Sequence, residues 1–152
     1  MSALELKIPP PVVALVVAAA MWGFCLVAPS SDAPAQRYAV ALALAAIGVA
    51  FSVSGAVAFR TAGTTKNPMK PQAASVLVVA GVYRFTRNPM YFGVLIVLLA
   101  WAVFLWSAWV LLGPVVFVAY ITRFQIVPEE RVLATLFGGE YLAYKAKVRR
   151  WL

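Results

Sequence analysis

The segment from residue 90 to residue 127 is almost entirely apolar, and Arg123 is its only charged residue. Because about 20 residues of α-helix cross the core of a bilayer, this segment is too long for one membrane helix and long enough for two. Trp106 and Ser107 lie near its middle, where a tight turn would divide it. We therefore predict a hairpin of two membrane spans, at about 89–105 and 108–127.

Two earlier apolar segments predict two further spans, at about 12–28 and 38–59. The first resembles a signal peptide, but we expect it to remain as an uncleaved helix that begins at a run of prolines. The sequence is 64% hydrophobic and 12% charged, which leaves too little polar surface for a soluble domain of this length. We thus predict one all-α domain over residues 1–152, an integral membrane bundle of about four transmembrane helices.

The chain becomes polar after Pro128, and an amphipathic pattern runs from about 129 to 148. Gly138 and Gly139 divide this pattern into two parts. Amphipathic helices of this kind lie along a membrane surface with their apolar side buried. We predict two short interfacial helices over 129–148, packed against the bundle.

Lysine and arginine are distributed unevenly about the predicted spans. Cytoplasmic loops of membrane proteins carry most of the basic residues. Of the 13 basic residues, only Arg37 lies on the opposite side of the predicted bundle. We therefore expect both ends of the chain and the long 60–88 loop to be cytoplasmic, in a bacterial inner membrane. The net charge of +8 is then explained by topology and membrane lipids, and not by binding of nucleic acid.

The sequence contains no histidine and a single cysteine, Cys25. Catalysis by a serine–histidine or cysteine–histidine pair, histidine-bound zinc or iron, and an intrachain disulfide are therefore excluded. We expect no bound metal, and we interpret Cys25 as a small apolar residue of the first helix.

A first candidate site surrounds Arg87, at the predicted start of the third span. Asn88 is a favourable N-cap, and Pro89 is a favourable first helical residue. The free backbone N–H groups of this helix start, beside Arg87, would form a site for a carboxylate or a phosphate. The alternative is a capped helix whose arginine reaches lipid headgroups, and the residues alone do not separate the two interpretations.

A second candidate site lies where the fourth predicted span leaves the membrane. Glu129 and Glu130 are two of only 5 acidic residues, and Arg123 precedes them on the same helix. A cation and two carboxylates at one membrane exit suit a zwitterionic ligand. The alternative is that the two carboxylates only favour the positive end of a helix dipole.

The two candidate sites together resemble a known family. The pattern Arg-Asn-Pro-x-Tyr-x-Gly begins at Arg87, Glu-Glu follows after roughly one helical hairpin, and Phe-Gly-x-x-Tyr-x-x-Tyr begins at Phe137. This combination resembles the isoprenylcysteine carboxyl methyltransferase and phospholipid methyltransferase superfamily over residues 64–152. The first two spans carry no signature of this superfamily.

The resemblance implies a compact helical fold that encloses S-adenosylmethionine at its cytoplasmic end and releases S-adenosylhomocysteine. Arg123 and Glu130 are the implied catalytic residues, because Arg123 falls where the family often has a polar residue near the reaction centre. The sequence departs from the pattern at Asn88, where many members have histidine; an asparagine amide can donate and accept hydrogen bonds but cannot serve as a base at that position. The residues implied to bind the cofactor are Tyr83, Arg87, Asn88, Pro89, Tyr91, Gly93, Glu129 and Glu130.

The methyl acceptor is left open by the sequence, although we expect a lipophilic molecule that reaches the site from the bilayer. A carboxylate acceptor needs no base, whereas an amine must lose a proton and the chain has few groups to take it, which favours a carboxylate or another anionic acceptor. The alternative is that Glu129 or Glu130 serves as the base for an amine. Two other functions stay open: an NADPH-dependent reductase of the sterol or steroid reductase type, and a non-enzymatic lipid-binding protein. The sequence does not give the oligomeric state.

Overall fold

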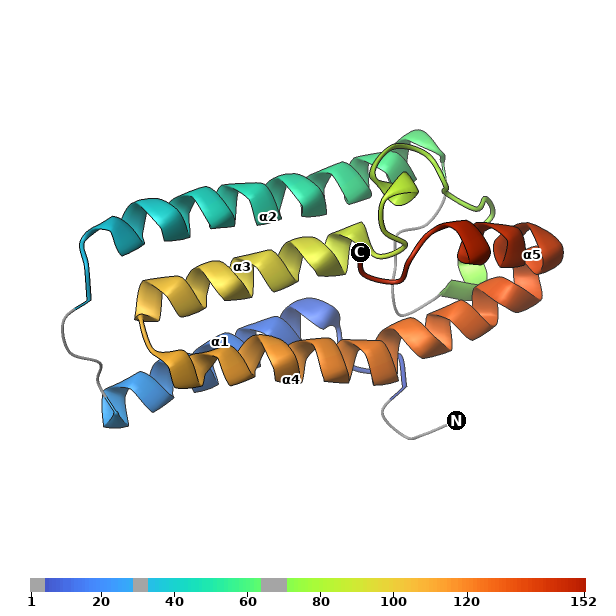
Figure 1. The fold of residues 1–152 in the computed structure, drawn as a ribbon. Coiled ribbons are helices and arrows are strands. Elements are labelled where there is room, and N and C mark those ends of the chain that lie inside the picture. Colours follow the sequence, from blue (N-terminus) through green and yellow to red (C-terminus); the bar gives the residue numbers. More distant parts are fainter. Residues whose placement is uncertain (1–4, 29–32, 64–70) are drawn as a thin grey trace.

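The computed structural model describes residues 5–28, 33–63 and 71–152, which form a bundle of helices (Figure 1). The part of the chain that it describes contains no strand, so the predicted all-α fold is confirmed. The apolar helices are α1 (Pro10–Val27), α2 (Gln36–Thr61), α3 (Pro89–Leu105) and α4 (Leu112–Ile121). The other elements are the 3-10 turns η1 (Pro71–Ala73), η2 (Gly81–Arg84) and η3 (Ala108–Leu111), the π-helical turn η4 (Thr122–Ile126) and α5 (Val127–Lys147).

Prolines and one left-handed residue set several of the helix ends. Pro10 and Pro89 are the first residues of α1 and α3, where a helix does not use the missing N–H group. Trp106 follows α3 in the left-handed conformation, with φ 54°, and Ser107 is extended. This tight turn is the predicted hairpin, and it directs α4 back along α3.

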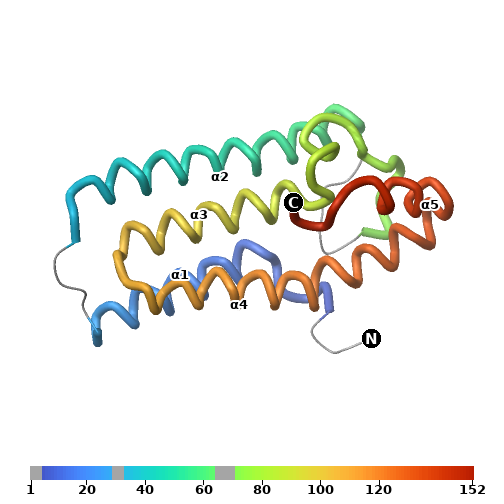
Figure 2. The backbone as a smooth tube through the Cα atoms, viewed as in Figure 1, coloured from blue at the N-terminus to red at the C-terminus, as the bar shows by residue number. Residues whose placement is uncertain are grey.

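α3 lies in the middle of the bundle, with α2 on one side and with α1 and α4 on the other (Figures 1 and 2). α2 approaches α3 through the small residues Gly48, Ser52 and Gly55. A Cβ atom at Gly48 would lie 2.6 Å from the carbonyl oxygen of Gly93, and the Ser52 hydroxyl donates a hydrogen bond to the carbonyl oxygen of Met90 at 3.3 Å. Such small-residue contacts let two membrane helices pack with their backbones close together.

The outward surfaces of the bundle are strongly apolar. On α2, for example, Leu42 is 73% exposed and Val53 is 54% exposed. α1, α2 and the helical segment Ala108–Lys147 are each long and apolar enough to cross a membrane, and α3 is a shorter apolar helix. Exposure of this much apolar surface to water is unfavourable, whereas lipid tails accept it. These surfaces are those of an integral membrane protein.

The structure corrects the prediction that a separate helix begins after Pro128. Proline has no N–H group, so it leaves the carbonyl oxygen four residues earlier, that of Phe124, without its helical partner. The backbone N–H of Leu6 donates a hydrogen bond to this oxygen at 3.0 Å. Because η4 also widens the helix just before the proline, α4, η4 and α5 form one continuous helical segment.

Gly138 interrupts α5, as the sequence predicts, with φ 49° and ψ −123°. The part of this segment beyond Val127 is charged, with glutamates in its first turn and lysines in its last, so we place it outside the apolar span. After α5 the chain becomes extended at Val148 and runs back to the start of α3, as the red end of the chain shows in Figure 1. There Arg87 N donates a hydrogen bond to the carbonyl oxygen of Arg149 at 3.0 Å. We call residues 148–152 the strap.

Candidate functional site

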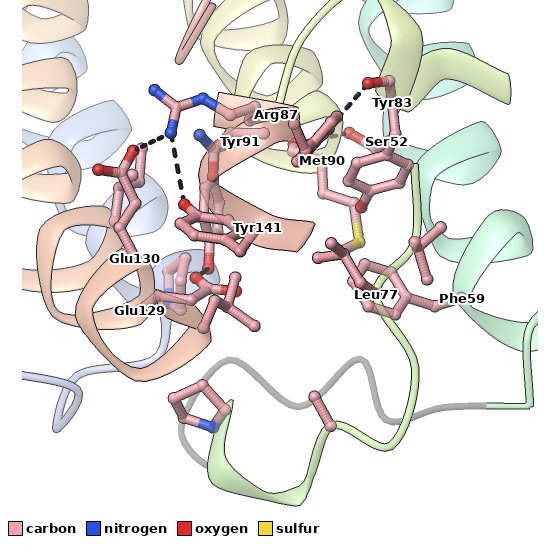
Figure 3. Close-up of a pocket in the computed structure, with 18 of the residues that line it drawn as sticks. Ser52, Phe59, Leu77, Tyr83, Arg87, Met90, Tyr91, Glu129, Glu130 and Tyr141 are labelled. Atoms are coloured by element: carbon pink, nitrogen blue, oxygen red, sulfur yellow. Dashed lines mark hydrogen bonds and ion pairs between the residues drawn. The ribbon is translucent and has the colours of Figure 1, made fainter. Parts of the chain in front are cut away.

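A cavity of about 290 Å³ lies at the end of the bundle where α3 begins (Figure 3). This volume is close to the lower limit for small-molecule sites, about 300 Å³. One wall is polar and comes from α5 and the start of α3, and the opposite wall is largely apolar and comes from α2 and residues 71–83. The cavity therefore suits a ligand with one charged end and one apolar end. The lining includes Phe59, Leu77, Tyr83, Arg87, Tyr91, Glu129, Glu130 and Tyr141.

Arg87 is the buried cation of the polar wall, and its side chain is only 9% exposed. Its Nη1 lies 3.0 Å from Oε1 of Glu130 and donates a hydrogen bond to the Tyr141 hydroxyl at 3.3 Å. Its Nε is buried and has no hydrogen-bond partner among the described residues. Buried polar groups nearly always have partners, so this N–H is available to an acceptor from water or from a ligand. The adjacent start of α3 favours an anion at the same place.

Glu130 is surrounded by positive charge. Its two oxygens accept hydrogen bonds from Nε and Nη2 of Arg150, both at 2.9 Å, and Lys145 Nζ lies 3.6 Å away. Burial alone would raise the pKa of Glu130, but the hydrogen bonds from Arg150 and the charges of Arg87, Arg150 and Lys145 outweigh it and lower the pKa. Three cations against one carboxylate leave two positive charges in excess around Glu130, which again favours an anionic ligand group nearby.

Glu129 lies against the same cavity in a different environment. Its Oε2 accepts a hydrogen bond from the Tyr91 hydroxyl at 3.3 Å. Burial raises the pKa of Glu129 to about 7, the hydrogen bond from Tyr91 acts in the opposite direction, and the charge of Glu130 adds to the rise. Glu129 is therefore a carboxylate that changes its charge near neutral pH, and it can bind a cation or accept a proton.

Three further tyrosines, Tyr83, Tyr141 and Tyr144, line the cavity. The Tyr144 hydroxyl donates a hydrogen bond to the carbonyl oxygen of Tyr83 at 2.8 Å, which ties α5 to η2. Burial raises the pKa of Tyr141 to about 12 and raises the pKa of Tyr83 and of Tyr144 further. All three phenols stay protonated at neutral pH, so they provide neutral hydroxyl groups and packing surfaces and do not act as bases.

Asn88 and Pro89 lie where the sequence places them, at the start of α3, but Asn88 does not act as a cap. Its side chain makes no capping hydrogen bond. Instead its Nδ2 donates a hydrogen bond to the carbonyl oxygen of Arg150 at 2.9 Å. This bond uses the amide nitrogen, whereas a cap would use the amide oxygen, so the observed contact joins Asn88 to the strap and does not cap the helix. Asn88 still lines the cavity.

Two residues implied by the resemblance lie away from the cavity. Arg123 pairs with Glu5 at 3.0 Å, its side chain is 56% exposed, and it does not line the cavity. Gly93 faces α2, where an added Cβ would meet the carbonyl oxygen of Gly48 and the hydroxyl of Ser52. Gly93 therefore allows α2 to approach α3, and the structure does not place it where a cofactor would need the space.

The apolar wall and the strap were not anticipated from the sequence. Phe59 comes from the end of α2, and residues 76–78, whose sequence suggests only an apolar loop, line the cavity. Arg150 reaches Glu130 from the strap, although the sequence shows it only as one of several basic residues near Leu152. Tyr141 and Tyr144 belong to a motif that the sequence does show, and this motif was the available signal for them. Among the described residues, no three histidine, cysteine, aspartate or glutamate side chains are grouped to hold a metal ion.

Comparison with known proteins gives a family for this chain. No solved structure matches it. An uncharacterized protein of Haemophilus influenzae is 48% identical to it over 63 residues, which are 41% of this chain and 100% of that protein. Residues 36–140 match the phospholipid methyltransferase family, so the match also covers α2, where the motifs gave no signal. Because the match spans more than half of the sequence and includes the Arg-Asn-Pro and Glu-Glu motifs, the chain belongs to the phospholipid methyltransferase family.

Proposed function

We propose that the protein transfers a methyl group from S-adenosylmethionine to a lipophilic acceptor at the cytoplasmic face of a bacterial inner membrane. Its family is one of membrane methyltransferases that generally use this cofactor. The observation that carries the proposal is that buried Arg87 and the carboxylate of Glu129 face one cavity. S-adenosylmethionine has a carboxylate and an ammonium at one end and an adenosyl group at the other, which matches the two walls.

Each part of the cavity has a role in this proposal. Arg87, with its unpaired Nε and the start of α3, would hold the carboxylate. Glu129, oriented by the Tyr91 hydroxyl, would hold the ammonium group. The apolar wall, which includes Phe59 and Leu77, would contact the apolar part of the ligand and exclude water.

The cofactor, when bound, supplies an activated methyl group, so the chain has to bind, orient and dehydrate the reactants more than it has to transfer protons. Glu130 enters this proposal as the partner of Arg87 and not as a group that contacts the reacting atoms. Arg123 is not part of the proposed site, because its partner Glu5 holds it outside the cavity.

Calorimetry of the purified protein in detergent tests the proposal. We expect saturable binding of S-adenosylhomocysteine, and the absence of such binding would overturn the proposal. NADPH should not bind, which separates a methyltransferase from a reductase. A non-enzymatic lipid-binding protein would show no methyl transfer to any fraction of a lipid extract.

The raised pKa of Glu129 predicts a pH dependence of binding. The ammonium group pairs with the ionised carboxylate, so affinity for S-adenosylhomocysteine should rise about five- to tenfold from pH 6 to 7.5 as Glu129 loses its proton. Stability of the ligand-free protein should change in the opposite direction. Between about pH 4.5 and 7 the folded state keeps a proton that the unfolded state has lost, so the free energy of unfolding falls as the pH rises.

Calorimetry and chemical unfolding at a series of pH values measure both quantities. The variant Glu129→Gln, which cannot ionise, should bind weakly at every pH and should lose both slopes. A wild-type affinity that stays constant from pH 6 to 7.5 would exclude Glu129 as the ligand of the ammonium group.

The acceptor needs a separate experiment. An amine acceptor must lose a proton. Burial raises the pKa of Glu129 to about 7, but in this proposal Glu129 is paired with the ammonium group of the cofactor, so it does not by itself remove the reason for which the sequence favours an anionic acceptor. After incubation of the protein with radiolabelled S-adenosylmethionine and lipid extract, a base-labile product would indicate a carboxylate acceptor, and a base-stable product would indicate an amine.

The proposed orientation follows from the charges at the two ends of the bundle. Arg37 lies in the first turn of α2, at the end remote from the cavity, whereas Arg87 and the basic residues of α5 and the strap lie at the cavity end (Figure 1). The positive-inside rule then places the cavity on the cytoplasmic side. A reporter protein that is active only in the cytoplasm tests this orientation when it is fused to the C-terminal end of the chain, after the strap.

A further inference from the structure

We infer that Arg150, in the strap, is a positioning residue: by binding Glu130 it allows Arg87 to leave Glu130 and to bind the carboxylate of the ligand. This inference rests on the proposed function, since it concerns the same ligand. It assigns a role in the binding step to a residue outside the recognised motifs.

Two arginines contact Glu130, and the contact of Arg150 is the stronger of the two. Arg150 binds both carboxylate oxygens, through Nε at 2.9 Å and Nη2 at 2.9 Å. Arg87 contacts only Oε1, through Nη1 at 3.0 Å, and shares that oxygen with Arg150. A planar guanidinium that binds both oxygens of a carboxylate forms the stronger and better oriented pair. Arg150 is therefore the principal partner of Glu130.

The strap fixes the position of Arg150. Its carbonyl oxygen accepts hydrogen bonds from Asn88 Nδ2 at 2.9 Å and from Thr86 Oγ1 at 3.2 Å. The next residue, Trp151, packs against the core and donates a hydrogen bond to Thr122 Oγ1 at 3.2 Å. Arg150 is thus held on both sides beside the start of α3, so its guanidinium does not need to be ordered when a ligand binds.

The consequence for Arg87 follows from the cost of breaking a buried ion pair. A buried carboxylate left without a partner is strongly unfavourable, and Glu130 is only 8% exposed. While Arg150 is present, Glu130 keeps two short hydrogen bonds after Arg87 moves to the ligand. Without Arg150, the remaining partners of Glu130 are Arg87 and the more distant Lys145, so Arg87 would be retained by Glu130 and the ligand carboxylate would have to displace it.

The experiment compares Arg150→Met with the double variant Arg150→Met/Glu130→Gln. We expect Arg150→Met to weaken binding of S-adenosylhomocysteine about five- to tenfold in calorimetry. The double variant should recover most of the lost affinity, because glutamine does not retain Arg87. If Arg150 had only a structural role, the second substitution would add damage and would not restore binding.

A second ligand tests whether Arg150 affects only the binding of the charged end of S-adenosylhomocysteine. 5′-Methylthioadenosine lacks the carboxylate and the ammonium group, so its affinity should be the same in the wild type and in Arg150→Met. Lys147→Met, which removes one exposed positive charge from α5, is the matched control and should bind both compounds as the wild type does. If Arg150→Met does not fold, Arg150→Lys, which keeps the charge and loses the two-point contact, should show a smaller loss that Glu130→Gln again restores.

The outcomes separate the two proposals. If the wild type does not bind S-adenosylhomocysteine, the proposed function fails and this inference fails with it. If the wild type binds and Arg150→Met binds equally well, or if the double variant binds no better than Arg150→Met, only the role of Arg150 is overturned.

Discussion

Replacement of Arg87 by methionine is expected to weaken binding of S-adenosylhomocysteine by about 10- to 100-fold. A hydrogen bond to a charged group contributes about 1.5–3 kcal/mol, which corresponds to this range of affinity. The side chain is buried at the start of α3, and water cannot easily take its place beside the carboxylate. Calorimetry on the purified variant measures the effect.

The protein should remain folded after this substitution. Loss of Arg87 does not leave Glu130 unpaired, because Arg150 still binds both of its oxygens. Arg84→Met is the matched control, since Arg84 lies three residues earlier on an exposed position of η2 and carries the same charge. The proposed carboxylate site would be excluded if Arg87→Met and Arg84→Met bound the ligand with the same affinity.

Local sequence patterns predicted those site residues that lie at a helix start and those that are among the few charged residues next to the apolar spans. Pro89 does begin α3. One cavity is lined by both halves of the predicted site, Arg87 and Tyr91 on one side of the hairpin and Glu129 and Glu130 on the other. The sequence could predict this because a hairpin of two spans returns the chain to the membrane face from which it started. Acidic residues at that return point therefore lie near the basic residue before the hairpin.

The remaining parts of the site depend on long-range contacts that no local pattern records. Asn88 has the preferred residue type for a cap, yet its side chain binds the carbonyl oxygen of Arg150, 62 residues later. Pro128 predicts a helix start, but the N–H of Leu6 satisfies the carbonyl oxygen that the proline leaves free. For Asn88, a distant carbonyl oxygen binds the amide nitrogen and the side chain makes no cap; for Pro128, a distant N–H group replaces the one that proline lacks. In both cases a long-range contact decides the outcome, and the local rule gives the wrong result.

Gly93 is another residue whose role depends on a long-range contact. Its replacement by alanine is expected to have the second large effect, a loss of stability. An added Cβ at this position would overlap the backbone of Gly48 and the side chain of Ser52, so α2 would have to move away from α3. Overpacking of a well-packed interface costs about 1–3 kcal/mol, and the cost is greater where backbone must move. We therefore expect Gly93→Ala to lower the free energy of unfolding in detergent by at least this amount.

Gly23→Ala is the matched control, because Gly23 lies in α1 and has nothing within 4 Å of the position of an added Cβ. This substitution should leave stability unchanged or raise it slightly, since alanine favours a helix over glycine by up to about 1 kcal/mol. Chemical unfolding and calorimetry on both variants separate the two roles considered for Gly93. If it serves the packing of α2 on α3, Gly93→Ala is less stable, but the fraction that is folded binds S-adenosylhomocysteine as the wild type does. A variant with normal stability and weakened binding would instead return Gly93 to the cofactor site.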